Sequence, residues 1–270
     1  MNADVRPLTV SDLVAMKSAR RRIVMLTCYD AVFAGLLEQA GVDILLVGDS
    51  LNQVLAGHET TLSTTLDQMI YHAGAVRRAS RRALVFVDLP FLTYQVTIPD
   101  AIRNAGRVLQ ESGAHGVKLE GGSHMAETLA ALVERGIPVI GHLGLTPQSV
   151  HALGGYRVQG RDAAAADRLV NDAKALEAAG ACSIVLELIP AALGARISQA
   201  LTIPTIGIGA GPQCDGQVLV LHDMLGLNEQ FAPKFLKHYA KLGDAVREAV
   251  RAYGSDVREG KYPGKEHSFE

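Results

Sequence analysis

Short runs of apolar residues recur along the chain, and four of them end in a carboxylate. These runs are Ile44–Val47 followed by Gly48-Asp49, Leu84–Asp88, Gly116–Glu120 and Ser183–Glu187. Continuous β-branched and leucine-rich runs of this length are typical of strands that are buried on both faces of a parallel sheet. An ionised group in such a place costs free energy unless it is paired or bound to a metal. Four acids at the same end of four strands therefore indicate a site.

Segments with helical periodicity, such as residues 65–78 and 162–179, lie between the apolar runs. The expected strands number eight, near residues 23–28, 43–48, 83–88, 116–120, 138–142, 183–188, 203–208 and 217–222. Eight strand–helix units in one chain of this length predict a single (β/α)8 TIM barrel domain over residues 1–270, with an open doubly wound sheet as the alternative. Active sites of such barrels lie at the carboxyl ends of the strands, which is where the four acids fall.

The segments outside the barrel strands carry further expectations. An N-terminal helix is expected to begin at a Thr9 or Ser11 cap and to close the bottom of the barrel. Long connections at residues 51–64 and 144–160 follow strands, so we expect them over the barrel mouth, where lids are found. A C-terminal helix is expected from about Pro233 to Tyr253. The polar tail at residues 254–270 has no core pattern, and it either lacks fixed structure or docks on a neighbouring subunit.

Composition indicates a large soluble domain, since 48% of the residues are hydrophobic and 20% are charged. The formal net charge of −2 gives no reason to expect a nucleic-acid partner. Cys28, Cys182 and Cys214 are too scattered for a zinc motif and odd in number, which indicates a reducing compartment. The N-terminal residues lack the apolar core of a signal peptide, and no run approaches the ~20 residues of a membrane span. We therefore expect a cytoplasmic protein without a membrane partner.

Three carboxylates, Asp49, Asp88 and Glu120, come from the second, third and fourth expected strands. Lys118 lies two residues before Glu120, so both side chains share a face of the strand and must point into the barrel mouth. An oxygen-only cluster suits Mg²⁺, which binds one or two carboxylates together with water and substrate. The alternative is a structural ion network. One lysine cannot neutralise three acids plus Glu187, which favours the metal site.

His142 follows the fifth expected strand, and its position leaves two roles open. A single histidine there either lines the site or serves as a hydrogen-bonded structural residue.

A series of motifs extends this pattern along the chain. The motifs are Thr27–Asp30, Leu46–Ser50, Gly57-His58, Asp88–Phe91, Val117–Gly122, Gly141–Ser149, Gly154–Gly160, Leu186-Glu187 and Ile206–Gly211. In order and spacing, from about residue 8 to 230, they resemble the ketopantoate hydroxymethyltransferase family. The nine-residue string Gly141–Ser149 is highly specific. The chain departs from the family pattern at Leu51-Asn52, where small residues or methionine are typical.

The resemblance implies an activity. Members of this family transfer a hydroxymethyl group from 5,10-methylenetetrahydrofolate to 3-methyl-2-oxobutanoate and form 2-dehydropantoate (ketopantoate), the committed step toward pantothenate and coenzyme A. They use Mg²⁺ and form homo-oligomers, commonly decamers.

The resemblance also implies roles for individual residues. The expected Mg²⁺ ligands are Asp49, Asp88 and Glu120, and the expected keto-acid contacts are Asp49, Ser50, Asp88 and Lys118. Glu187 would accept the C3 proton. The residue types suit this chemistry, because a metal acts as a Lewis acid on the keto group and a positioned carboxylate base contributes about 10²–10⁴-fold to the rate.

Two other functions stay open on the sequence. One is another Mg²⁺-dependent 2-oxo-acid barrel enzyme of the phosphoenolpyruvate mutase and isocitrate lyase group, whose C–C lyases typically carry a Lys-Cys-Gly-His loop that this chain does not contain. The other is a non-catalytic ligand-binding barrel, against which the joint presence of the four acids and Lys118 argues.

Overall fold

A closed barrel of eight parallel strands forms the centre of the computed structural model, which describes residues 6–269. The strands are β1 (Ile23–Thr27), β2 (Ile44–Val47), β3 (Leu84–Asp88), β4 (Gly116–Glu120), β5 (Val139–Gly144), β6 (Ser183–Glu187), β7 (Thr205–Ile208) and β8 (Gly216–Leu219). Each strand pairs in parallel with the next, and β8 pairs with β1. The predicted (β/α)8 barrel is confirmed, and barrel closure excludes the open sheet.

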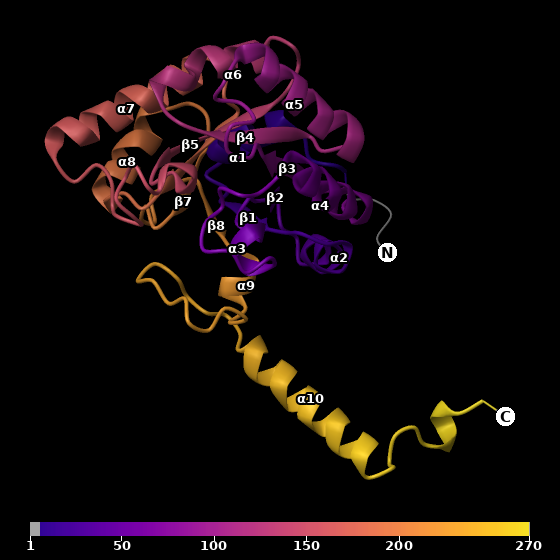
Figure 1. Cartoon of the computed structure of the whole chain (residues 1–270). Helices are drawn as coiled ribbons and strands as arrows, with labels where there is room; N and C mark the ends of the chain where they lie inside the picture. Colours follow the sequence, from indigo (N-terminus) through magenta and orange to yellow (C-terminus); the bar gives the residue numbers. More distant parts are fainter. Residues whose placement is uncertain (1–5, 270) are drawn as a thin grey trace. The chain divides into compact units, whose positions relative to one another are not determined.

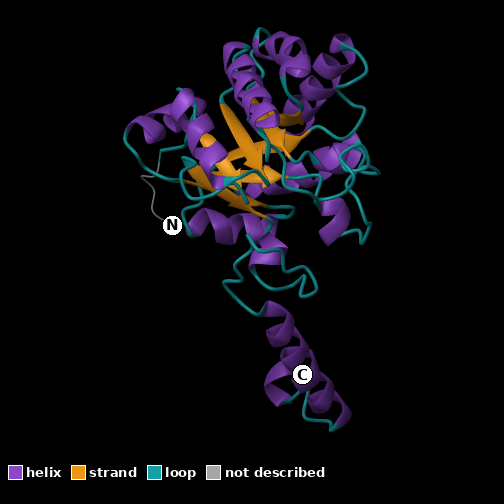
Figure 2. Ribbon diagram, turned by 90° about the vertical axis from the view of Figure 1, so that its left-hand side faces the viewer, coloured by secondary structure: helices purple, strands orange, loops and turns teal. Residues whose placement is uncertain are grey.

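Helices surround the barrel strands, as Figures 1 and 2 show. They are α2 (Ala31–Gln39), α3 (Leu51–Val54), α4 (Leu66–Ala79), α5 (Ile98–Ser112), α6 (Ala126–Val133), α7 (Ala163–Ala178) and α8 (Ala191–Ala200), with short 3₁₀ turns η1 (Ser123–Met125) and η2 (Pro147–Ser149). Four of them, α2, α4, α5 and α7, begin where a capping side chain satisfies a free backbone N–H group. Thr65 accepts a hydrogen bond from the amide of Gln68, and Asp162 accepts one from the amide of Ala165.

The bottom of the barrel is closed by α1 (Val10–Ser18), as predicted. The helix begins at Thr9, whose backbone N–H donates to Asp12 Oδ2 at 2.7 Å. Its buried side chains Leu13 and Met16 belong to the same apolar cluster as strand residues such as Ile23 and Phe86. Burial of this helix face against the strand ends therefore seals the end of the barrel opposite the four acids.

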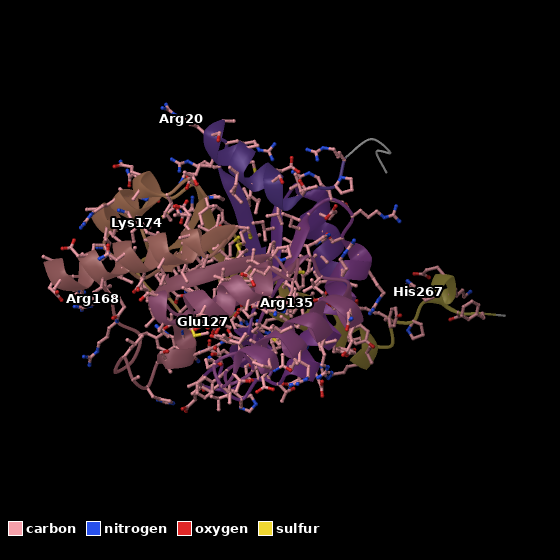
Figure 3. The ribbon with its side chains drawn as sticks, turned by 90° about the horizontal axis from the view of Figure 1, so that it is seen from above. Arg20, Glu127, Arg135, Arg168, Lys174 and His267 are labelled. Atoms are coloured by element: carbon pink, nitrogen blue, oxygen red, sulfur yellow. The ribbon has the colours of Figure 1, made fainter. Side chains whose placement is uncertain are left out.

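Charged side chains on the outer helices are exposed to solvent. Figure 3 labels several of them, among them Glu127 on α6 and Arg168 and Lys174 on α7. Most charge thus lies on a solvated outer surface, and the buried charged residues include a group at the barrel mouth. Within residues 6–269, the helices are too short or too polar to cross a membrane.

Contacts between Cα atoms divide the chain into two compact units, residues 1–220 and 221–270. The second unit contains α9 (Leu221–Met224), α10 (Leu242–Arg258) and the turn η3 (Lys265–His267). The prediction of a single domain over residues 1–270 stays a prediction. Residues 1–5 and Glu270, which that range includes, lie outside the described residues.

The C-terminal helix has different bounds from the predicted ones. It begins at Leu242 instead of Pro233, because the preceding backbone forms other hydrogen bonds: Tyr239 N donates to Met224 O and Leu242 N donates to Leu225 O. It also continues past Tyr253 to Arg258, so the first residues of the predicted polar tail are helical. The late start depends on bonds that the local polar pattern does not encode.

Candidate active site

The strand register brings the charged residues of β3, β4 and β5 together at the barrel mouth. Asp88 is paired with Lys118 across β3 and β4, and Glu120 is paired with His142 across β4 and β5. Lys118 Nζ lies 2.8 Å from Asp88 Oδ1, and both side chains are only 5% exposed. The predicted shared orientation of Lys118 and Glu120 is therefore confirmed, since both are buried inside the barrel mouth.

Asp49 and Ser50 reach the same place through the turn after β2. Asp49 N donates a hydrogen bond of 3.1 Å to Asp88 Oδ2, which joins the ends of β2 and β3. A Cβ atom on Gly48 would lie 2.8 Å from Ser50 Oγ, so a larger residue there would displace the serine hydroxyl. The hydroxyl groups of Ser50 and Tyr29 are 2.9 Å apart, which holds the serine at the mouth.

His142 lies between two carboxylates. Its Nδ1 is 3.3 Å from Glu120 Oε1 and its Nε2 is 3.2 Å from Glu187 Oε2. Lys118 Nζ also lies 3.2 Å from Nδ1. Burial and the positive charge of Lys118 lower the pKa of His142, but the two carboxylates more than offset them and raise it to about 9. The histidine thus contacts two of the predicted site acids, and its role in lining the site stays a prediction.

Glu187 differs from the other acids in its access to solvent. Its side chain is 15% exposed, whereas the side chains of Asp88 and Glu120 are 5% and 3% exposed. It lies at the end of β6, across the mouth from the acids of β2 to β4. Of these three carboxylates, Glu187 is therefore the most accessible to a substrate.

The electrostatics of the site show an excess of negative charge. The pKa of Asp49 is raised by burial first and then by the charges of Asp88 and Glu120. Burial lowers the pKa of Lys118, but the surrounding carboxylates outweigh burial and raise it, so the lysine stays charged. Four acids face Lys118 and His142, so the net charge of these side chains is negative and can be compensated by a divalent cation.

The fit of Mg²⁺ can be tested on the donor atoms. Glu120 Oε1 and Asp88 Oδ1 are buried and lack a well-directed hydrogen bond, although His142 Nδ1 lies 3.3 Å from the first and Lys118 Nζ 2.8 Å from the second. Within residues 6–269, however, no group of three or more His, Cys, Asp and Glu side chains is arranged to hold a metal by itself. The predicted shell of Asp49, Asp88 and Glu120 stays a prediction. The donor set fits an ion that takes one or two carboxylates and completes its shell with water and substrate.

Two buried residues of the site escaped the sequence analysis as functional candidates. Gln148 in η2 is 5% exposed and donates from Nε2 to Asp49 Oδ2 at 2.9 Å. Tyr94, which is 1% exposed, lies after β3 and places its hydroxyl 2.8 Å from Gln148 Oε1. Gln148 stands inside the specific string Gly141–Ser149, and this was its only signal. Nothing in the local sequence marks Tyr94.

The two long connections predicted as lids contact each other. Gln53 on α3 donates from Nε2 to the hydroxyl of Tyr156 at 3.1 Å. Burial raises the pKa of Tyr156, the hydrogen bond with Gln53 lowers it, and the charges of Glu187 and Asp49 raise it further. The loops after β2 and β5 therefore join beside the mouth.

Comparison with known sequences identifies the relatives of this chain. A family model described as ketopantoate hydroxymethyltransferase matches residues 7–265. A 3-methyl-2-oxobutanoate hydroxymethyltransferase from Pelobacter propionicus is 54% identical over 264 residues, which cover 98% of this chain and 98% of the relative. A protein of the same name from Syntrophus aciditrophicus is 54% identical over 98% of this chain and 97% of its own.

Solved structures with a similar fold are more distant in sequence. A putative phosphonomutase from Burkholderia cenocepacia has a TM-score of 0.65 at 17% identity and covers 82% of this chain and 96% of its own. A phosphonopyruvate hydrolase in complex with oxalate and Mg²⁺ has a TM-score of 0.61 at 14% identity, over 96% and 92% of the two chains. These likenesses show the barrel fold alone. The near-complete sequence matches show more, and this chain belongs to the ketopantoate hydroxymethyltransferase family.

Proposed function

We propose that this protein transfers a hydroxymethyl group from 5,10-methylenetetrahydrofolate to 3-methyl-2-oxobutanoate and forms 2-dehydropantoate. The observation that carries the proposal is the meeting of Asp49, Asp88, Lys118, Glu120 and Glu187 at one barrel mouth, in a chain of this family. A non-catalytic barrel would have no use for so costly a buried charge cluster.

Binding of the keto acid would use the cationic side of the site. Lys118 is held by Asp88 at 2.8 Å and supplies positive charge for the substrate carboxylate. Ser50, which is oriented by the hydroxyl of Tyr29, can donate a hydrogen bond to the same group. Together they orient the substrate so that its C3–H bond points across the mouth toward β6.

Mg²⁺ would be held by Asp49 and Asp88 directly, with Glu120 acting through water. When bound, Mg²⁺ withdraws electrons from the keto group, a Lewis-acid effect worth several kcal/mol. This arrangement reconciles the three predicted acids with the absence of a three-residue metal group within residues 6–269. The raised pKa of Asp49 supports this arrangement too, because a cation would offset the negative charges of Asp88 and Glu120 that contribute to raising it.

Glu187 would act as the general base. Its carboxylate takes the C3 proton, and the C3–H electron pair forms the enolate. C3 then bonds to the methylene carbon of the folate while the C–N bonds to that carbon break, water supplies the hydroxyl oxygen, and tetrahydrofolate leaves. His142, 3.2 Å from Glu187 Oε2, orients the carboxylate through its Nε2. A positioned base of this kind contributes about 10²–10⁴-fold to the rate.

The proposal extends to the assembly and the compartment. We expect a homo-oligomer larger than a dimer, commonly a decamer in this family, and a location in the cytoplasm. The compartment is supported by Cys28, Cys182 and Cys214, which are unpaired and buried.

Deuterium exchange at C3 tests the proposed chemistry. The protein is incubated with 3-methyl-2-oxobutanoate in D₂O, with Mg²⁺ or with EDTA, and the C3 proton is followed by NMR. We expect exchange with Mg²⁺ and its loss with EDTA, and formation of 2-dehydropantoate once 5,10-methylenetetrahydrofolate is added. Exchange that survives EDTA would remove the metal from the proposal. Binding of the keto acid without exchange would favour the ligand-binding barrel.

A further inference from the structure

Gln148 is the most connected uncharged residue at the site. Its side-chain Nε2 donates to Asp49 Oδ2 and to Leu89 O, both at 2.9 Å. Its backbone N–H donates to Glu120 Oε2, also at 2.9 Å. One buried residue of η2 therefore contacts two of the three predicted metal ligands, which come from different strands.

The orientation of the Gln148 amide is determined by its neighbours. Tyr94 donates its hydroxyl hydrogen to Gln148 Oε1 at 2.8 Å, and the same hydroxyl oxygen accepts from Glu120 N at 3.0 Å. Gln95 Nε2 also donates to Gln148 Oε1, at 3.1 Å. A flipped amide would place its oxygen against the carboxylate of Asp49 and its NH₂ group against these donors. The NH₂ group must therefore face Asp49.

We propose that Gln148, oriented by Tyr94, is a positioning residue that sets the Asp49 carboxylate for metal binding. The proposal rests on the proposed function, because it takes Asp49 as a metal ligand. A hydrogen bond to one carboxylate oxygen restricts rotation of the group and leaves the other oxygen to face the cation. The carbonyl of Leu89 holds the second amide hydrogen, so the NH₂ group has no freedom to turn away from Asp49.

The side chain and the backbone of Gln148 act on different carboxylates, and a substitution can separate them. Gln148→Met keeps the length of the side chain and the backbone N–H bond to Glu120, but it removes the donor to Asp49. Loss of a partner that orients a metal ligand costs about 10–100-fold in metal affinity. The expected defect therefore lies in metal binding and not in the protein fold.

The experiment measures Mg²⁺ binding directly by calorimetry on the full-length protein without keto acid, beside thermal unfolding. We expect Gln148→Met to remain folded and to bind Mg²⁺ about 10–100-fold more weakly than wild type. Raised Mg²⁺ should restore C3 exchange in this variant. Gln39→Met, at an exposed glutamine of α2, is the matched control and should bind Mg²⁺ as wild type does.

The outcomes separate this proposal from the proposed function. A wild-type protein that binds no Mg²⁺, either alone or with 3-methyl-2-oxobutanoate, would remove the metal from the function itself. A wild type that binds Mg²⁺, beside a folded Gln148→Met variant with the same Kd, would overturn only the positioning role. If Gln148→Met does not fold, Tyr94→Phe decides, because it removes the orienting hydroxyl and keeps the ring. We expect a several-fold weaker Kd, and an unchanged Kd would overturn the proposal.

Discussion

At the residue scale, the basic side chains of the site are each in contact with carboxylates. Lys118 contacts Asp88 and His142, and His142 in turn contacts Glu120 and Glu187. Because the carboxylates and the two basic side chains compensate one another's charge, removal of one partner leaves another buried charge without compensation. Substitutions in this group must therefore preserve shape, and Asn or Gln replacements are more informative than Ala.

Glu187→Gln isolates the base at the residue scale. The amide keeps the volume and a contact with His142 but cannot accept a proton from carbon. We expect kcat and C3 deuterium uptake to fall about 10²–10⁴-fold, while calorimetric binding of 3-methyl-2-oxobutanoate with Mg²⁺ is retained. Exchange at the wild-type rate would rule Glu187 out, and His142 would then be the next candidate for the base.

The departure from the family pattern at Leu51-Asn52 has a structural role. Both residues are buried, and Asn52 Nδ2 donates to Thr60 O at 2.7 Å and to Ser63 Oγ at 2.8 Å. Asn52 O also accepts from His58 N. The asparagine therefore organises the long loop after β2 from inside, and its side chain serves the loop and not the pocket rim.

Among the elements, α1 depends on one lysine for its attachment to the barrel bottom. Lys17 Nζ lies 3.0 Å from Asp215 Oδ2 and donates to Ser198 O and Ile203 O at 2.8 and 2.9 Å. Asp215 Oδ2 also accepts from Thr205 N at 2.8 Å. These bonds join α1 to α8 and to the connections on either side of β7, at the end of the barrel away from the mouth.

Lys17→Met tests the attachment of α1. The methionine keeps most of the apolar stem, but it removes the ammonium group from two carbonyls and from the carboxylate of Asp215. We expect the free energy of unfolding in urea to fall by about 1–3 kcal/mol. Mg²⁺ binding should not change, since the mouth is at the other end of the strands. Lys174→Met, at an exposed position of α7, is the control. Equal stability of the two variants would contradict the attachment role.

At the scale of the whole molecule, α10 presents an apolar face that is exposed in this single chain. The side chains on it are spaced like one face of a helix, and they are Val246, Val250, Tyr253 and Val257. An exposed apolar face of this kind is typical of an interaction surface. It supports the predicted homo-oligomer, in which this face would be covered by another subunit.

Light scattering measures the predicted assembly. The chain has a mass of 28.7 kDa, and we expect a particle several times heavier at working concentration. Val250→Asp places a charge on the apolar face of α10 and should shift the population toward smaller species. Arg251→Asp puts the same charge on the neighbouring exposed position and should leave the mass unchanged. A monomer mass for the wild type would refute the oligomer.

Local sequence was sufficient for much of the barrel. Runs such as Leu84–Asp88 predict buried strands because apolar periodicity reports burial directly, and Thr65 and Asp162 mark helix starts because a cap acts within three residues. The acids at the strand ends also predicted a site from local sequence alone. An ionised group beside a buried run requires a partner, whatever the rest of the chain does.

Other features depended on which distant segments meet when the barrel closes. Asp49 and Gln148 are 99 residues apart, and only the order of the strands places their side chains in contact. His142 lies between Glu120 and Glu187 because β5 pairs with both β4 and β6. The late start of α10 follows from carbonyls of residues 224 and 225, which local periodicity does not report. Tertiary proximity determines which polar groups pair, whereas the spacing of apolar residues along the chain indicates which positions are buried.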